Sequence, residues 1–174
     1  MVSGHLPGCV LWFTGLSGAG KSTLAAAVVR ELERRGVATE YLDGDSVRAL
    51  SPTGFSRADR DAHVKGVGFL ASRLEHHGVT VLCALISPYA EARQHVRGLC
   101  RRFMEIYVAT PLDECERRDV KGLYARARRG EIRNFTGIDD PYEPPEHPEL
   151  TLDTRALTVD QCVARVLEFF GGKK

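Results

Sequence analysis

The stretch Thr14–Thr23, TGLSGAGKST, decides the fold predicted for this chain. It fits the pattern G-x-x-x-x-G-K-[ST], with Gly15, Gly20, Lys21 and Ser22 at the specified positions. Such a loop surrounds a polyphosphate with backbone N–H groups and a helix N-terminus, and its glycines let the backbone approach closely. Lys21 would reach the β- and γ-phosphates, and the Ser22 hydroxyl would bind Mg²⁺.

The flanking sequence supports this interpretation. Residues 9–13 (CVLWF) form an apolar run typical of a buried parallel strand, and the apolar positions of residues 24–32 have helical spacing before a stop at Gly36. A plain Gly/Ser turn would not require strand, loop and helix in this order. We therefore predict an ATP site, and the residues expected to hold ATP in this loop are Gly15, Leu16, Ser17, Gly18, Ala19, Gly20, Lys21, Ser22 and Thr23.

Strand and helix patterns alternate along the rest of the chain. Strands are expected at residues 39–42, 79–86, 103–109 and 150–152. Helices are expected at residues 56–77 and 90–101, and two further helices should begin at residues 110 and 158. This alternation predicts an α/β fold with a doubly wound, mainly parallel sheet of the phosphate-loop kinase type, and ligands at the carboxyl ends of its strands. We expect a single domain of residues 1–174.

Residues 119–149 interrupt this rhythm. The segment begins basic and helical and then becomes rich in glycine, proline and acidic residues. A connection this long is more often functional than passive, so we expect a lid. A disordered loop is the alternative, but its apolar residues argue against disorder.

Composition limits the classes of partner. The chain has 174 residues, of which 43% are hydrophobic and 27% charged, and a net charge of +1, which argues against a broad nucleic-acid surface. Its apolar runs are too short to span a membrane. The five cysteines form no C-x-x-C pair, which favours reduced thiols and a cytoplasmic protein. We expect a small-molecule nucleotide as partner, no nucleic acid and no membrane.

Two carboxylates follow the second predicted strand, in the stretch LDGDSVR at residues 42–48. Phosphoryl transfer needs a carboxylate to orient the attacking hydroxyl or to hold Mg²⁺. Asp43 and Asp45 are the candidates, and Asp45 is better placed beyond the strand. An Asx turn would also explain them. Arg48 would bring a cation suited to an anionic acceptor.

Together these motifs resemble the adenylylsulfate kinase family. The resemblance covers nearly the whole chain, and the segments that carry it are GLSGAGKST, LDGDSVR, GFSRADRD, ISPYAEAR, ERRDVKGLYARARRGEI and NFTGIDDPYEPPEHPEL. It implies transfer of the ATP γ-phosphate to the ribose 3′-hydroxyl of adenylylsulfate with Mg²⁺, in sulfate assimilation, commonly in a homodimer.

The resemblance also implies roles for individual residues. Catalytic roles fall on Asp45, Lys21, Ser87 and Lys121, magnesium binding on Ser22 and Asp43, and contact with the ATP adenine on Arg118. Ser87 carries a phosphoserine label in some accounts of the family, but direct in-line transfer needs no covalent step, so we favour binding. The acceptor nucleotide would contact Asp45, Arg48, Phe55, Arg60, Ile86, Ser87, Lys121 and Phe135. His63, which departs from the family pattern, is a further candidate for acceptor binding.

Departures from the family pattern cluster on the acceptor side. The loop at residues 49–54 is about two residues shorter than usual, and His63, Lys65 and Gly66 replace an asparagine and two arginines. These changes leave two alternatives open: a kinase for another nucleotide, such as a cytidine diphosphoramidate, and an inactive nucleotide-binding module. Retention of Lys21 and Asp45 with the other site residues argues against the inactive module.

Overall fold

The computed structural model describes residues 7–50, 54 and 56–172. They form one parallel sheet with strand order β2-β3-β1-β4-β5. The strands are β1 (Cys9–Thr14), β2 (Thr39–Asp43), β3 (Thr80–Ala84), β4 (Phe103–Val108) and β5 (Leu150–Leu152). The helices are α1 (Lys21–Arg34), α2 (Gly44–Leu50), α3 (Arg57–His76), α4 (Ala90–Leu99), α5 (Leu112–Arg118), α6 (Leu123–Arg128) and α7 (Val159–Gly172).

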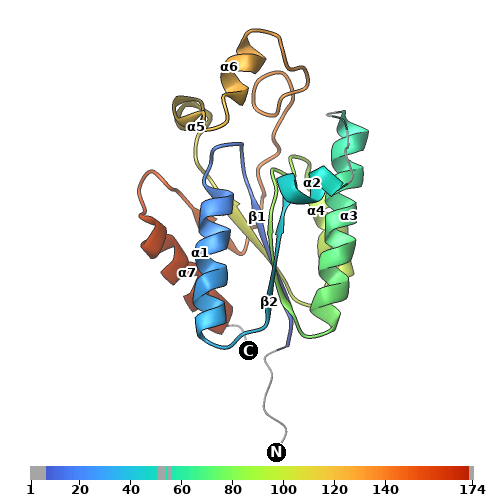
Figure 1. Ribbon diagram of the computed structural model, residues 1–174, viewed down its shortest axis with the longest axis vertical. Helices are drawn as coiled ribbons and strands as arrows, with labels where there is room; N and C mark the ends of the chain where they lie inside the picture. Colours follow the sequence, from blue (N-terminus) through green and yellow to red (C-terminus); the bar gives the residue numbers. More distant parts are fainter. Residues whose placement is uncertain (1–6, 51–53, 55, 173–174) are drawn as a thin grey trace, which may run out of the picture.

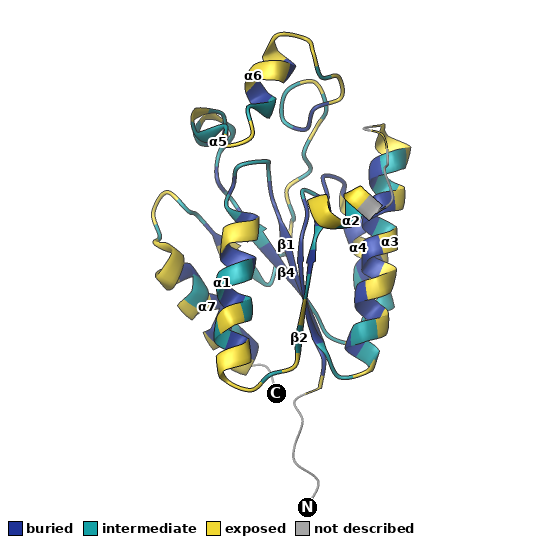
Figure 2. Cartoon of the chain, in the orientation of Figure 1, coloured by how far each residue is buried: buried dark blue, intermediate teal, exposed yellow. Residues whose placement is uncertain are grey.

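Helices cover both faces of the sheet. Figure 1 shows α1 and α7 on one side and α3 and α4 on the other, and each pair buries its own apolar cluster against the strands. All six residues of β1 are buried because this strand lies between β3 and β4 (Figure 2). Its unbroken apolar sequence is what a strand covered on both faces requires. The expected doubly wound α/β fold is confirmed.

The carboxyl ends of the strands form the functional edge of the sheet. The chain leaves β1 toward β2 and leaves β3 toward β4, so the connections after these two neighbouring strands run in opposite directions and open a crevice between them. Beyond this edge lie α5, α6 and the loop that follows α6, at the top of Figure 1, and the chain then returns beside the sheet to β5. No helix in the described part of the chain is both long and apolar enough to cross a membrane.

Capping boxes begin two of the predicted helices. The Ser56 hydroxyl accepts from the Asp59 backbone N–H, while the Asp59 carboxylate accepts from Ser56, which starts α3. Thr158 and Gln161 make the same reciprocal pair before α7.

Helix α2 was not predicted. No helix was expected in the stretch at residues 42–48, and an Asx turn was the alternative explanation of its aspartates, but residues 44–50 form a short helix with Asp45 in its first turn. The predicted strand and helix ends that differ from the structure do so by a few residues at most, because the ends of such elements are specified weakly by sequence.

Candidate active site

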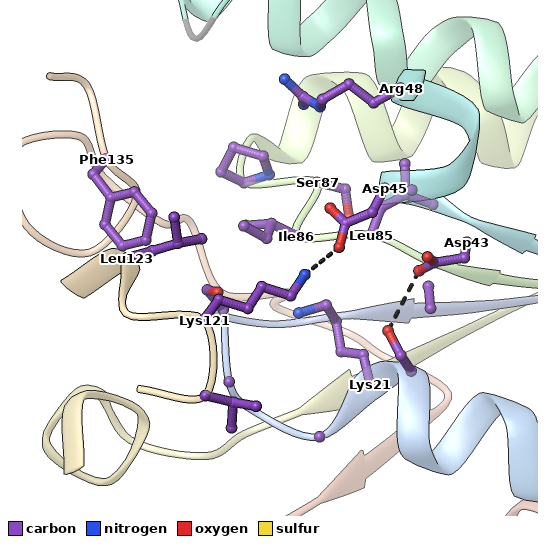
Figure 3. Close-up of a pocket in the computed structure, with 18 of the residues that line it drawn as sticks. Lys21, Asp43, Asp45, Arg48, Leu85, Ile86, Ser87, Lys121, Leu123 and Phe135 are labelled. Atoms are coloured by element: carbon purple, nitrogen blue, oxygen red, sulfur yellow. Dashed lines mark hydrogen bonds and ion pairs between the residues drawn. The ribbon is translucent and has the colours of Figure 1, made fainter. Parts of the chain in front are cut away.

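A cavity of about 620 Å³ opens at the carboxyl edge of the sheet. Five parts of the chain line it: the phosphate loop, residues 43–48 at the end of β2 and in α2, residues 60–64 of α3, residues 84–88 after β3, and residues 118–124 together with Phe135. Figure 3 shows Phe135 and Leu123 on the side of the 119–149 segment, with Arg48 and Asp45 of α2 across from them. The predicted phosphate and acceptor residues therefore share one chamber.

The phosphate loop depends on glycine for its shape. Gly15, Gly18 and Gly20 all have positive φ, at 150°, 74° and 106°. A Cβ at Gly15 would lie 2.5 Å from the Val108 carbonyl oxygen of β4, so the loop also needs the space that glycine leaves. Gly20 is the N-cap of α1 and supplies no side-chain cap, so the first N–H groups of the helix stay available to an anion.

Lys21 lies at the bottom of this loop. Its side chain is buried, and its Nζ donates to the Leu16 carbonyl oxygen at 2.7 Å. Burial lowers the pKa of Lys21 to about 8. Burial disfavours the charged form of the Lys21 ammonium. Phosphate oxygens would stabilise that charge, so the backbone N–H groups and Lys21 together favour an anionic ligand.

Ser22 and Asp43 meet at the edge of the cavity. The Ser22 hydroxyl donates to Asp43 Oδ1 at 3.4 Å, and Ser46 donates to Oδ2 of the same carboxylate at 3.4 Å. A hydroxyl and a carboxylate are the oxygen ligands that suit a hard cation such as Mg²⁺. Within residues 7–50, 54 and 56–172, no cluster of three or more His, Cys, Asp or Glu could hold a metal. A cation here would therefore need oxygens from phosphate or water as well.

An ion pair crosses the mouth of the cavity. Lys121 Nζ donates to Asp45 Oδ2, although 76 residues separate them in the chain (Figure 3). Both side chains are largely exposed, at 55% for Lys121 and 68% for Asp45. The pair thus joins the 119–149 segment to α2 through groups that a ligand could separate at little cost.

The acceptor side is more enclosed. Phe135 is buried and meets the Tyr124 ring edge-on, with 5.1 Å between ring centroids. Arg60 is also buried, donates to the Asn134 carbonyl oxygen at 2.6 Å and lies 4.0 Å from Asp140. This wall therefore combines an aromatic face with a cation held in place by main-chain and carboxylate oxygens.

Two further acceptor candidates lie on α2 and α3. Arg48 donates to the Gly54 carbonyl oxygen at 3.2 Å, and His63 is buried in the cavity wall. Burial lowers the pKa of His63, and the charge of Arg48 lowers it further, so His63 is neutral at pH 7. Phe55, also predicted here, lies outside the described residues.

Ser87 presents its main chain rather than its hydroxyl to the site. The hydroxyl is buried, accepts from Trp12 Nε1 at 3.1 Å and donates to Thr14 Oγ1 at 2.9 Å. Ser87 also has a φ of 41°, which is strained for a residue with a side chain. Ile86 precedes it, lines the cavity and accepts from Thr14 through its carbonyl oxygen at 2.7 Å.

Arg118 lies behind the phosphate loop, where the adenine contact was predicted. It donates to Gly18 and Thr154 at 3.4 and 3.0 Å and lines the cavity. Thr154 was not predicted, although its hydroxyl donates to the Ala19 carbonyl oxygen at 3.1 Å and so supports the loop. The one signal available was its position just past the last strand, on the ligand edge of the sheet.

Comparisons with known proteins agree with this arrangement. The family model described as adenylylsulphate kinase matches residues 7–153. The chain belongs to the adenylylsulphate kinase family. An adenylyl-sulfate kinase of Synechococcus sp. (strain JA-3-3Ab) is 52% identical over 163 residues, which cover 92% of this chain and 93% of the relative.

Solved structures of adenylylsulphate kinases are similar as well. The Mycobacterium tuberculosis APS kinase CysC in complex with AMPPNP and APS has a TM-score of 0.91 and 42% identity, covering 95% of this chain and 99% of that one. The hexameric APS kinase from Thiobacillus denitrificans has a TM-score of 0.74 and 36% identity, covering 96% of this chain and 29% of that one. The chain is therefore a phosphotransferase of the adenylylsulphate kinase type, and the comparisons favour this activity over a different acceptor or an inactive module.

The departures from the adenylylsulphate kinase pattern separate in space. His63 lines the cavity, whereas Lys65 and Gly66, on the next turn of α3, do not. A Cβ at Gly66 would meet nothing within 4 Å, so this glycine faces open space. Of these three residues, His63 is the one positioned to alter acceptor binding directly, and residues 51–53 of the shortened loop lie outside the described residues.

Proposed function

We propose that this chain transfers the γ-phosphate of ATP to the ribose 3′-hydroxyl of adenylylsulfate and forms 3′-phosphoadenylylsulfate. The observation that carries the proposal is that Asp45 lines the same cavity as the phosphate loop and Phe135. The M. tuberculosis relative, whose structure is described with AMPPNP and APS, supports the same pair of ligands here.

On the ATP side, the phosphates would lie against the loop amides and Lys21, with the adenine against Arg118. Ser22 and Asp43 would hold Mg²⁺, since both offer oxygen ligands beside the loop. When bound, Mg²⁺ would neutralise charge on the phosphate oxygens.

On the acceptor side, the purine would bind against Phe135, and Arg48 and Arg60 would bind the phosphosulfate. Asp45 would then accept a hydrogen bond from the 3′-hydroxyl and keep it in line with the γ-phosphorus. As the new O–P bond forms, the bond from the γ-phosphorus to the leaving ADP oxygen breaks, and the hydroxyl proton passes to Asp45.

Lys121 would change partners during this cycle. In the structure it neutralises Asp45, and an incoming hydroxyl would take its place on that carboxylate. The released ammonium would then stabilise the charge that moves between the nucleotides. We propose that residues 119–149 act as the lid that carries Lys121 to this position.

Ser87 would act as a binding residue and not as a phosphate carrier. Its hydroxyl is enclosed by Trp12 and Thr14, so it would need to break both bonds to reach a phosphorus atom. Direct transfer between the two nucleotides needs no such step.

A coupled assay tests the proposed reaction. The purified protein is given ATP, Mg²⁺ and either adenylylsulfate or a cytidine diphosphoramidate, and ADP release and the phosphorylated product are both measured. Turnover with adenylylsulfate is expected. Turnover with the cytidine compound alone would assign a different acceptor, and ATP binding without any product would assign an inactive module.

We also propose a homodimer that works in the cytoplasm. The five cysteines are unpaired thiols, as expected in a reducing compartment.

The homodimer would use an exposed apolar surface. Phe69 and Leu70 on α3 are 61% and 44% exposed and could meet a second copy. Light scattering coupled to size-exclusion chromatography should give twice the mass of 19.2 kDa, and a monomer would contradict the assembly.

A further inference from the structure

Arg93 of α4 is buried outside the set of residues that line the cavity. Its Nε donates to Glu105 Oε1 of β4 at 2.7 Å, and that carboxylate is buried too. A buried ion pair loses much hydration, so its remaining donors need partners. They find two carbonyl oxygens: one terminal nitrogen donates to Ser87 at 2.6 Å and the other to Glu143 at 2.7 Å.

These two carbonyls belong to two different segments on the acceptor side of the site. Ser87 ends the loop after β3 that lines the cavity, whereas Glu143 lies in the returning arm of the lid, defined here as residues 134–149. The returning arm also carries Phe135. The two parts meet directly as well, since the Glu143 N–H donates to the Pro88 carbonyl oxygen at 2.8 Å and the Glu143 carboxylate accepts from the Ala90 N–H at 2.7 Å.

The loop after β3 needs such support. Ser87 has a φ of 41°, a conformation that costs about 1–2 kcal/mol for a residue with a Cβ. Trp12 and Thr14 hold its hydroxyl from the sheet side. Arg93 holds the Ser87 carbonyl from the α4 side and Thr14 holds the Ile86 carbonyl, so the peptide groups before and after Ser87 are both fixed.

We propose that Arg93 is a positioning residue for the acceptor nucleotide. One guanidinium fastens the Ile86–Ser87 loop and the returning arm into a single wall, and thereby sets the position of Phe135 relative to Asp45. The inference rests on the proposed function, because it takes the acceptor to bind between this wall and Asp45. Lid movement is then left to residues 119–133, which carry Lys121.

Arg97 provides a matched control within the same cluster. It donates to Glu105 at 3.3 Å and forms an ion pair with Glu149 at 2.7 Å. Unlike Arg93, it has no hydrogen bond to the carbonyl of Ser87 or Glu143 among those of the described residues. Replacing Arg97 therefore perturbs the ion-pair cluster but leaves in place the clamp, meaning the hydrogen bonds from Arg93 to the Ser87 and Glu143 carbonyl oxygens.

The test compares Arg93→Lys with Arg97→Lys in steady-state kinetics, with KM measured separately for adenylylsulfate and ATP. Lysine keeps the charge but cannot hold two carbonyls and a carboxylate in one plane. Arg93→Lys should raise KM for adenylylsulfate about tenfold or more, since small displacements of a bound substrate are costly. The KM of Arg93→Lys for ATP should stay within about twofold of the value for the unmodified protein. The same holds for the KM values of Arg97→Lys for adenylylsulfate and for ATP.

Equal increases in both KM values of Arg93→Lys, or an acceptor KM no higher than that of Arg97→Lys, would overturn the proposal. If Arg93→Lys does not fold, Glu105→Gln weakens the same clamp, and an unchanged ratio of the two KM values overturns the proposal equally.

Should the unmodified protein not phosphorylate adenylylsulfate, the proposed function fails while the clamp can still be tested. Amide hydrogen exchange should then be faster in residues 86–93 and 134–143 of Arg93→Lys than of Arg97→Lys, with exchange in residues 15–23 unchanged. Equal exchange in the two variants overturns the positioning role.

Discussion

Replacing Asp45 by asparagine separates a catalytic role from a structural one. The Asp45 side chain is 68% exposed and its partner Lys121 is 55% exposed, so losing their ion pair should cost less than about 1 kcal/mol of folding free energy. For a chain of this length, that is a fall in melting temperature of about 2–4 °C at most. A carboxylate that orients the acceptor hydroxyl and takes its proton typically contributes about 10²–10⁴ in rate. That range is about 2.7–5.4 kcal/mol in the barrier, well above the stability term.

The assay follows ADP release with saturating ATP and adenylylsulfate, and ATP binding is measured separately by calorimetry. Asp45→Asn should lose most of kcat and keep its ATP affinity, because the phosphate loop is untouched. Glu131→Gln is the control: Glu131 pairs with Arg129 and does not line the cavity, so it removes a carboxylate from the lid without reaching the site. Near-normal turnover by Asp45→Asn, or an equal loss in Glu131→Gln, would refute the role assigned to Asp45.

Three further predictions concern the acceptor side. Phe135→Ala should weaken adenylylsulfate binding by about 1–3 kcal/mol, the contribution of a stacked base, with ATP binding retained; unchanged acceptor affinity in calorimetry would rule out the stacking contact. His63 is neutral in the free protein because burial lowers its pKa. An anionic acceptor would favour the protonated form of His63, so the affinity for adenylylsulfate should rise as pH falls from 7 to 5.5. His63→Asn should abolish this dependence, and identical pH profiles would exclude His63 as its source. Ser87→Ala leaves the Trp12 N–H unpaired and should cost about 1–3 kcal/mol of stability, yet retain transfer; complete loss of transfer in a folded Ser87→Ala would instead favour a phosphoserine.

Much of the fold could be predicted because its signals are local. The buried strand before the glycine loop, the helix after it and the capping boxes at Ser56 and Thr158 each depend on residues within a few positions of one another. Helix α2 escaped prediction because residues 44–50 contain glycine and aspartate, which are also typical of turns. Only its attachment to the end of β2 and its packing beside α3 favour the helix.

The residues of the candidate site likewise include some that the sequence predicted and some that it did not. The loop that would bind phosphate could be predicted from its motif, and the cavity does bring Asp45, Lys121 and Phe135 together. Arg93 was not predicted, because an arginine on a helix is usually a solvated surface charge. Its burial is visible only when α4 lies on β4 and places Glu105 against it.

The sequence by itself determined the phosphate loop, since the steric limits on its glycines and the first turn of α1 act over a few residues. It also determined that parallel strands would be covered by helices on both faces. The tertiary structure alone decided which distant charges meet. Asp45 and Lys121 lie 76 residues apart, and Arg93 holds Ser87 and Glu143 from different segments. These contacts depend on the strand order β2-β3-β1-β4-β5, which brings the carboxyl ends of separate strands to one edge, and no local preference of the chain encodes that order.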